Sequence, residues 1–164
     1  MRKVETQFGS GAYAQNITIG THQLVSDLDS SKGGADIGPS PHEYLAAALA
    51  SCTSMTLKMY AGRKSWGLEN AIVTVNINRT DEVERFTRAI SLVGNLDAEQ
   101  TARLMEIADK CPVHKALIGT IAIETQLISS HKPGFMPPGN SHYFEVLEDP
   151  ELELDPELDD LPAL

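Results

Sequence analysis

A helical pattern of about twenty residues, beginning at Pro41, constrains the fold of this 164-residue chain most strongly. The segment is rich in Ala, Leu and Met and contains no further Pro and no Gly until Gly62. Ser40 suits the N-cap, Pro41 the first helical position and Glu43 the third, where a carboxylate completes a capping box. Since residues 33–39 are rich in Gly, we predict that the helix begins sharply after them and that other elements pack around it.

Alternating apolar and polar residues on both sides of this helix predict antiparallel strands. Residues 4–28 divide into short strands at glycine-containing turns. Residues 71–79 and 85–93 both alternate with a period of two, and the charged segment 80–84 joins them as a turn. The pattern at residues 119–127 predicts one further strand. Helices and antiparallel strands in this order indicate an α+β domain.

A second helical region separates the hairpin from that last strand. Asp97 can cap it, with Gln100 three positions later. Leu104 and Ile107 mark its apolar face. After it, Pro112 suits the first position of a new helical turn.

The net charge of −10 is concentrated at the C-terminal end of the chain. Residues 145–164 contain no Lys or Arg and hold nine acids, namely Glu145, Glu148, Asp149, Glu151, Glu153, Asp155, Glu157, Asp159 and Asp160. Residues 1–144 therefore carry 13 bases and 14 acids. We predict a domain over residues 1–128. Residues 129–164 then form a Pro/Gly linker and an acidic tail, either extended in solvent or carrying a leucine-bearing peptide that docks on a partner.

The composition also excludes several classes of function. An acidic chain with no basic patch argues against binding to nucleic acid or to an anionic membrane surface. No window approaches 18 apolar residues, and the N-terminus lacks the apolar run of a signal peptide. Two cysteines in such a chain predict free or redox-active thiols and a cytoplasmic location.

The two cysteines are the positions that carry chemistry. Cys52 lies in the middle of the long helix among apolar neighbours, so it is either a small buried side chain or a reactive thiol. Cys111 precedes Pro112, at an N-cap position where helical N–H groups favour a thiolate, unless it is an incidental residue at a helix break. A metal site from Cys111, His114, Cys52 and His42 is the weakest alternative, because no second paired motif is present.

Two segments resemble the signature of the OsmC/Ohr family. They are residues 38–53, GPSPHEYLAAALASCT, and residues 111–117, CPVHKAL. The order of the predicted elements matches as well, so the resemblance covers about residues 4–128. The resemblance implies an OsmC-like α+β fold in which two central helices pack against antiparallel sheets. It also implies an intertwined homodimer, with active sites where the subunits meet.

The same resemblance implies an oxidative-stress enzyme that reduces organic hydroperoxides with thiols. Cys52 would attack the peroxide, Cys111 would resolve the sulfenic acid as a disulfide, and a dithiol reductant would restore both. No cofactor or metal would be required. Glu43 would be the third site residue, by similarity to a family glutamate that orients an arginine.

The chain departs from the family pattern at that arginine and at that glutamate. Between Lys3 and Lys58 there is no Arg, and His42 occupies the position right after Pro41 where the peroxidases carry their glutamate. Arg63 or Lys58, from this subunit or the other, could substitute for the arginine. The alternative hypothesis is an OsmC-like dimer with little peroxidase activity that binds a small hydrophobic ligand.

Overall fold

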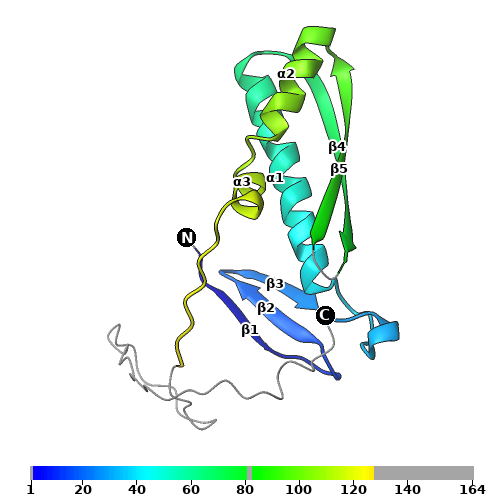
Figure 1. Ribbon diagram of the computed structural model, residues 1–164, viewed down its shortest axis with the longest axis vertical. Helices are drawn as coiled ribbons and strands as arrows, with labels where there is room; N and C mark the ends of the chain where they lie inside the picture. Colours follow the sequence, from blue (N-terminus) through cyan, green and yellow to red (C-terminus); the bar gives the residue numbers. More distant parts are fainter. Residues whose placement is uncertain (1, 81–82, 128–164) are drawn as a thin grey trace. The chain divides into compact units, whose positions relative to one another are not determined.

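The computed structural model describes residues 2–80 and 83–127 of the chain (Figure 1). All of its helices and strands lie in the first of two units, Met1–Ile121, and the second is Ala122–Leu164. The strands are β1 (Val4–Phe8), β2 (Gln15–Ile19), β3 (His22–Ser26), β4 (Gly67–Arg79) and β5 (Glu84–Asn95). The helices are the 3-10 turn η1 (Ser30–Lys32), α1 (Pro41–Arg63), α2 (Ala98–Ala108) and α3 (Pro112–Ile118). The predicted α+β architecture is confirmed.

Helix α1 begins as its sequence predicts. Ser40 is the N-cap, its hydroxyl accepts a hydrogen bond from the Glu43 N–H, and the Glu43 carboxylate accepts one from the Ser40 N–H at 2.7 Å. The helix ends at Arg63, one residue after Gly62. Asp97 and Gln100 form a second capping box, which starts α2.

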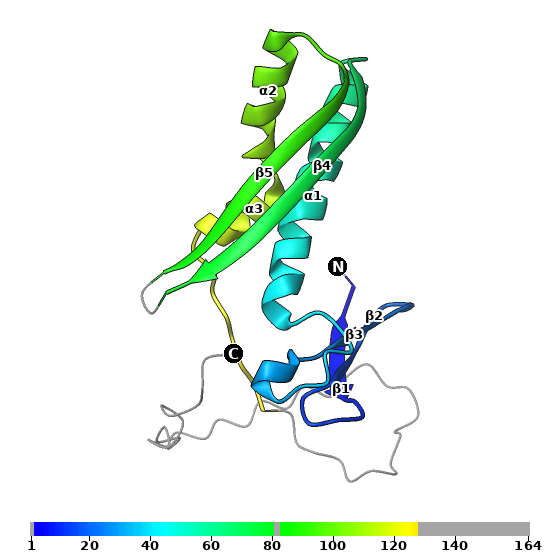
Figure 2. The ribbon, with the colours of Figure 1, turned by 90° about the vertical axis from the view of Figure 1, so that its right-hand side faces the viewer.

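The β4–β5 hairpin supplies one wall of the core. Its strands are antiparallel, with Val75 opposite Arg88 and Val73 opposite Ile90. Helices α1, α2 and α3 lie on one face of the hairpin (Figure 2). The core cluster between them consists of Leu57, Ala61, Leu104, Ile107 and Ala108. The other hairpin face presents exposed polar residues such as Thr74 and Asn76, as its alternation predicts.

The N-terminal strands form a three-stranded antiparallel sheet in the order β1-β2-β3. Hydrogen bonds tie it to the start of α1: the Tyr44 hydroxyl donates to the Val25 carbonyl at 2.6 Å, and the Ser26 hydroxyl donates to the Pro39 carbonyl at 2.9 Å. The loop after β3 folds around Asp27, which is 3% exposed. These bonds place the sheet next to the first turn of the helix that carries Cys52.

Residues 119–127 are not a strand, which corrects the sequence prediction. A strand requires a neighbour with which to form a hydrogen-bonded ladder, and no strand of the described residues pairs with this segment. Its apolar side chains Ile121, Ile123 and Leu127 are instead 60%, 85% and 82% exposed. The predicted linker and acidic tail, residues 129–164, lie outside the described residues. Within the described ranges, no helix is long and apolar enough to cross a membrane.

Candidate functional site

Helix α1 has two apolar sides, and Cys52 lies on the less covered one. The buried side carries Leu49, Thr53, Leu57 and Ala61, which recur every four residues against the hairpin and α2. Cys52 is half-buried. At a spacing of 100° per residue it points the same way as Leu45, Met55 and Met59, which are 42%, 64% and 58% exposed. The first thiol therefore borders an uncovered apolar stripe, which we define as Leu45, Met55 and Met59.

Cys111 is fully buried at the junction between α2 and α3. It is the N-cap of α3, as predicted, although its side chain makes no capping hydrogen bond. Its own N–H donates to the Ala108 carbonyl at 3.3 Å, and its carbonyl accepts from the Lys115 N–H at 3.1 Å. Hydrogen bonds to the preceding helix and to the following helix thus hold the backbone of Cys111 in place.

The two thiols lie close enough together to influence each other's protonation. Burial raises the pKa of Cys52, and a hydrogen bond between its thiol and Cys111 raises it further. Burial also raises the pKa of Cys111, but hydrogen bonds from Cys52, from the N–H groups of His114 and Val113 and from Thr53 outweigh burial and hold this pKa below its ordinary value. Of the two thiols, Cys111 is therefore the one that loses its proton more readily.

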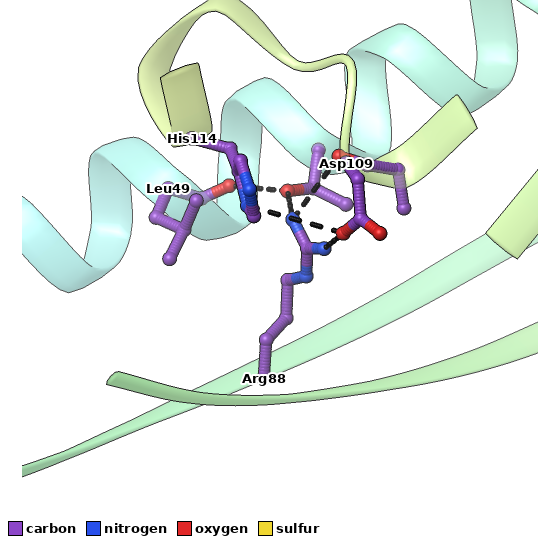
Figure 3. Close-up of polar contacts among 6 residues, drawn as sticks. Leu49, Arg88, Asp109 and His114 are labelled. Carbon is purple, nitrogen blue, oxygen red and sulfur yellow. Dashed lines mark hydrogen bonds and ion pairs between the residues drawn. The ribbon is translucent and has the colours of Figure 1, made fainter. Parts of the chain in front are cut away.

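Arg88 of β5 reaches across to the segments that carry both cysteines (Figure 3). Its Nη1 donates to the Thr53 hydroxyl oxygen at 3.0 Å and to the Ala108 carbonyl at 3.2 Å. Its Nη2 donates to Asp109 Oδ1 at 2.6 Å. The same carboxylate oxygen lies 3.9 Å from His114 Nδ1. Thr53 in turn donates to the Leu49 carbonyl at 2.7 Å, within α1.

The sequence analysis does not assign Arg88 to the site, because the family resemblance places the arginine in the N-terminal region. The sequence did carry a signal for it. Arg88 alternates with Phe86, Ile90 and Leu92 on the half-buried face of β5, where a charged side chain is out of place unless it has partners. The alternation of residues 85–93 predicts a strand but does not by itself identify the partners of Arg88.

The other predicted site residues lie elsewhere in the chain. Glu43 caps α1, and hydrogen bonds from the Ser40 N–H and hydroxyl hold the pKa of Glu43 below its ordinary value. Nine helical residues separate Glu43 from Cys52, which is roughly 14 Å along the axis and half a turn around it. His42 pairs with Glu84 of β5 at 3.2 Å. Lys58 lies over β4, beside Ser54 and Leu68.

An open groove of about 670 Å³ runs beside the Arg88 network. Its apolar wall consists of Leu45, Leu49, Val83, Phe86, Leu117, Ile118 and Ile121. Arg88 and His114 also line the groove, whereas neither cysteine does. The groove thus offers an apolar surface that meets polar groups next to the Cys111 junction.

The described residues contain no group of three or more His, Cys, Asp or Glu side chains placed to hold a metal ion. His114 of the Cys111-x-x-His114 motif instead makes a polar contact, since its ring faces Asp109 (Figure 3). The arrangement can therefore perform thiol chemistry, because it places a half-buried thiol, a buried thiol of lowered pKa and a largely buried guanidinium near one another.

Solved structures share this fold. The chain is 15% identical to an OsmC like protein from Mycoplasma pneumoniae, covering 73% of this chain and 88% of that one, with a TM-score of 0.64. It is 22% identical to an organic hydroperoxide resistance protein OsmC from Legionella pneumophila, covering 73% and 90%, with a TM-score of 0.52. For an organic hydroperoxide resistance protein from Elizabethkingia anophelis the identity is 20%, the coverage 73% and 89%, and the TM-score 0.54.

No curated protein matches the chain. A family model described as OsmC-like protein matches residues 33–126, which is more than half of the sequence and includes both cysteines. The resemblance in the two cysteine segments is thus confirmed, and so is the fold expected from it. The chain belongs to the OsmC-like protein family.

Proposed function

We propose that this chain reduces organic hydroperoxides, with Cys52 as the attacking thiol and Cys111 as the resolving thiol. The observation that carries the proposal is the thiol pair itself: Cys52 is half-buried, Cys111 is fully buried, and each thiol lies close enough to the other to shift its pKa. A thiol that meets a substrate must be accessible, whereas a resolving thiol only has to reach the first sulfur. Similar folds from Legionella pneumophila and Elizabethkingia anophelis are named organic hydroperoxide resistance proteins.

In the first step, Cys52 loses its proton to the Cys111 thiolate and attacks the terminal oxygen of ROOH. The O–O bond breaks, Cys52 becomes a sulfenic acid, and the alkoxide RO⁻ leaves. Cys111 then returns the proton to the alkoxide to give ROH. Cys111 thus accepts and returns the proton of a thiol whose pKa is held above its ordinary value by burial and by Cys111 itself.

In the second step, the Cys111 thiolate attacks the sulfur of the Cys52 sulfenic acid. An S–S bond forms, and the hydroxide that leaves takes a proton from solvent to become water. A dithiol reductant then exchanges with this disulfide, is itself oxidised, and restores both thiols. The cycle uses no cofactor or metal, and a reducing compartment such as the cytoplasm supplies the dithiol.

The groove beside Arg88 supports a substrate with an apolar organic group. Its wall, which includes Leu45, Leu49 and Phe86, would hold the R group of the hydroperoxide by apolar burial. Hydrogen peroxide has no such group, so the groove favours organic hydroperoxides over it.

We also propose that the active form is a homodimer in which helix α1 packs against a second copy. The uncovered stripe, Leu45, Met55 and Met59, leaves apolar surface in water next to Cys52. The unpaired segment 119–127 would gain a neighbour in the same assembly. Glu43, which lies far from Cys52 along its own helix, would then act from the second copy.

Steady-state turnover of cumene hydroperoxide with excess dithiothreitol tests this function. The Cys52→Ser variant should lose activity by at least about a hundredfold, because the attacking sulfur is gone. Cys111→Ser should still react once with peroxide but accumulate a sulfenic acid that dimedone traps at Cys52. Equal activity of wild type and Cys52→Ser would overturn the proposal. Hydrogen peroxide is the control substrate and should react more slowly with the wild type.

The groove also favours a second candidate function, in which the dimer binds a small hydrophobic ligand without turnover. Native mass spectrometry of the purified protein separates the two. A retained ligand together with unreactive thiols supports binding alone. An empty protein that turns over peroxide supports the enzyme.

A further inference from the structure

We propose that Arg88 is a positioning residue that sets Cys111 against Cys52 for disulfide formation. The geometry carries this inference: one largely buried guanidinium binds the helix that carries the first thiol and the junction that carries the second. The inference rests on the proposed function for its role in turnover, but it concerns a property of the thiol pair that can be measured without peroxide.

Because the Arg88 side chain is largely removed from water, it needs hydrogen-bond acceptors within the protein. Its side chain is 13% exposed and lies in the row of Phe86, Ile90 and Leu92, directly opposite Val75 on β4. A guanidinium taken out of water is costly unless its donors are matched by acceptors. Arg88 satisfies this condition with a hydroxyl, a backbone carbonyl and a carboxylate (Figure 3). Its position is therefore fixed by contacts on several sides.

The acceptors come from the two segments that must meet. Thr53 follows Cys52 directly in α1, is fully buried, and also hydrogen-bonds to Cys111. Ala108 and Asp109 end α2 just before Cys111, and the Ala108 carbonyl accepts from both Arg88 Nη1 and the Cys111 N–H. Arg88 thus joins the backbone of one cysteine to the helix of the other.

The link that Arg88 makes matters because a disulfide bond forms only in a narrow range of geometries. The two Cα atoms must come within about 7 Å, and the Cβ vectors must face each other. A displacement of about 1 Å can lower the rate of a positioned reaction by about a hundredfold. When Cys111 attacks the Cys52 sulfenic acid, the S–S bond forms as hydroxide leaves, so the sulfur trajectory matters in that step. Arg88 holds the junction from which this attack starts.

Variants of the full chain test the role. Arg88→Met removes the donors but keeps an unbranched apolar stem, whereas Arg88→Lys keeps a charge without the planar fork. Arg103→Met is the matched control. Arg103 also links α2 to α1, through Tyr60 at 3.2 Å, and pairs with Glu106, but it makes no described contact with either thiol.

The first measurement is the equilibrium constant for Cys52–Cys111 disulfide formation in glutathione buffers, read by mass spectrometry. We expect Arg88→Met to lower it by at least about tenfold, and Arg88→Lys by about threefold. Arg103→Met should remain within about twofold of wild type. Because glutathione drives the reaction, this result is independent of any peroxidase activity.

The second measurement separates the two steps after one equivalent of cumene hydroperoxide. In Arg88→Met, loss of the Cys52 thiol should proceed at nearly the wild-type rate, while disulfide closure slows by about tenfold and dimedone captures more sulfenic acid. A residue with a merely structural role would not split the steps in this way.

A folded Arg88→Met protein with a wild-type disulfide equilibrium would overturn the inference. If Arg88→Met does not fold, Asp109→Asn replaces it, because the Asp109 side chain is 65% exposed and, of the Arg88 hydrogen bonds, its loss weakens only that to Nη2. We expect about a threefold decrease in the equilibrium constant for this variant, and no decrease would contradict the inference. A wild type that forms the Arg88-dependent disulfide in glutathione but ignores peroxide would reject the proposed function and leave the inference standing.

Discussion

At the scale of single residues, the protonation of the two thiols follows from their surroundings. Cys52 gains little from the middle of α1, where neither helix end lies near it, and burial disfavours its charge. Cys111 has N–H donors from Val113 and His114 and a hydroxyl from Thr53. The difference between the two pKa values therefore arises from where the fold places hydrogen-bond donors. The sequence alone indicates only one contribution to it, the N-cap position of Cys111.

The Cys111→Ala substitution should lower the pKa of Cys52. The variant removes the hydrogen bond that raises this pKa, while burial continues to hold it above the ordinary value. Alkylation of Cys52 by iodoacetamide should therefore accelerate at a lower pH than in the wild type. Peptide mass spectrometry across a pH series measures the shift. An unchanged profile would show that the two thiols do not interact.

The Asp27→Asn substitution should make the protein less stable at neutral pH. Burial raises the pKa of Asp27, but hydrogen bonds from the N–H groups of Leu28, Ala35 and Ile37 outweigh it and hold the pKa below its ordinary value. A lowered pKa stabilises the fold above the unfolded value of about 3.9, and this stabilisation is lost as the pH falls through the folded value. Urea unfolding at pH 7 and pH 3 should show a difference in the free energy of unfolding between wild type and variant, and this difference should be smaller at pH 3. A difference independent of pH would contradict this.

At the scale of elements, the helix α1 organises both the core and the site. Leu57 lies fully buried in its inner face, packed with Ala61, Leu104 and Ile107. Leu57→Ala should reduce the free energy of unfolding by about 2–5 kcal/mol, because the removed atoms leave a cavity. Ile72→Ala, at a position on β4 that is 53% exposed, should cost less than about 1 kcal/mol. Chemical denaturation of both variants measures the difference, and equal losses would contradict the described core.

The sequence could predict the elements whose signals are local. Capping boxes at Ser40 and Asp97 fixed the starts of α1 and α2, and period-two alternation found the hairpin. The strand prediction for residues 119–127 was wrong because alternation describes the side chains of a strand. It does not show whether a second strand is available to pair with it. Arg88 was missed because its function depends on contacts 20 and 35 residues away along the chain. Such contacts follow from the packing of β5 against two helices and have no local pattern.

At the scale of the whole molecule, the dimer is the most consequential proposal. We expect a sedimenting species of about twice 17.8 kDa for the wild type. Met59→Glu places a charge on the uncovered stripe and should yield a monomer, whereas Thr74→Glu, on the polar face of β4, should not. Sedimentation velocity separates these outcomes. A monomeric wild type would reject the dimer. It would also reject the proposal that Glu43 of one copy acts on Cys52 of the other.

The central claim is that Cys52 and Cys111 form one redox unit. The most direct test adds one equivalent of cumene hydroperoxide to the reduced wild-type protein and measures the mass of the unreduced peptides that contain the cysteines. The account predicts that the two peptides become joined by a disulfide, with the loss of two hydrogens and the release of one cumyl alcohol. Two unmodified peptides and intact peroxide would contradict it.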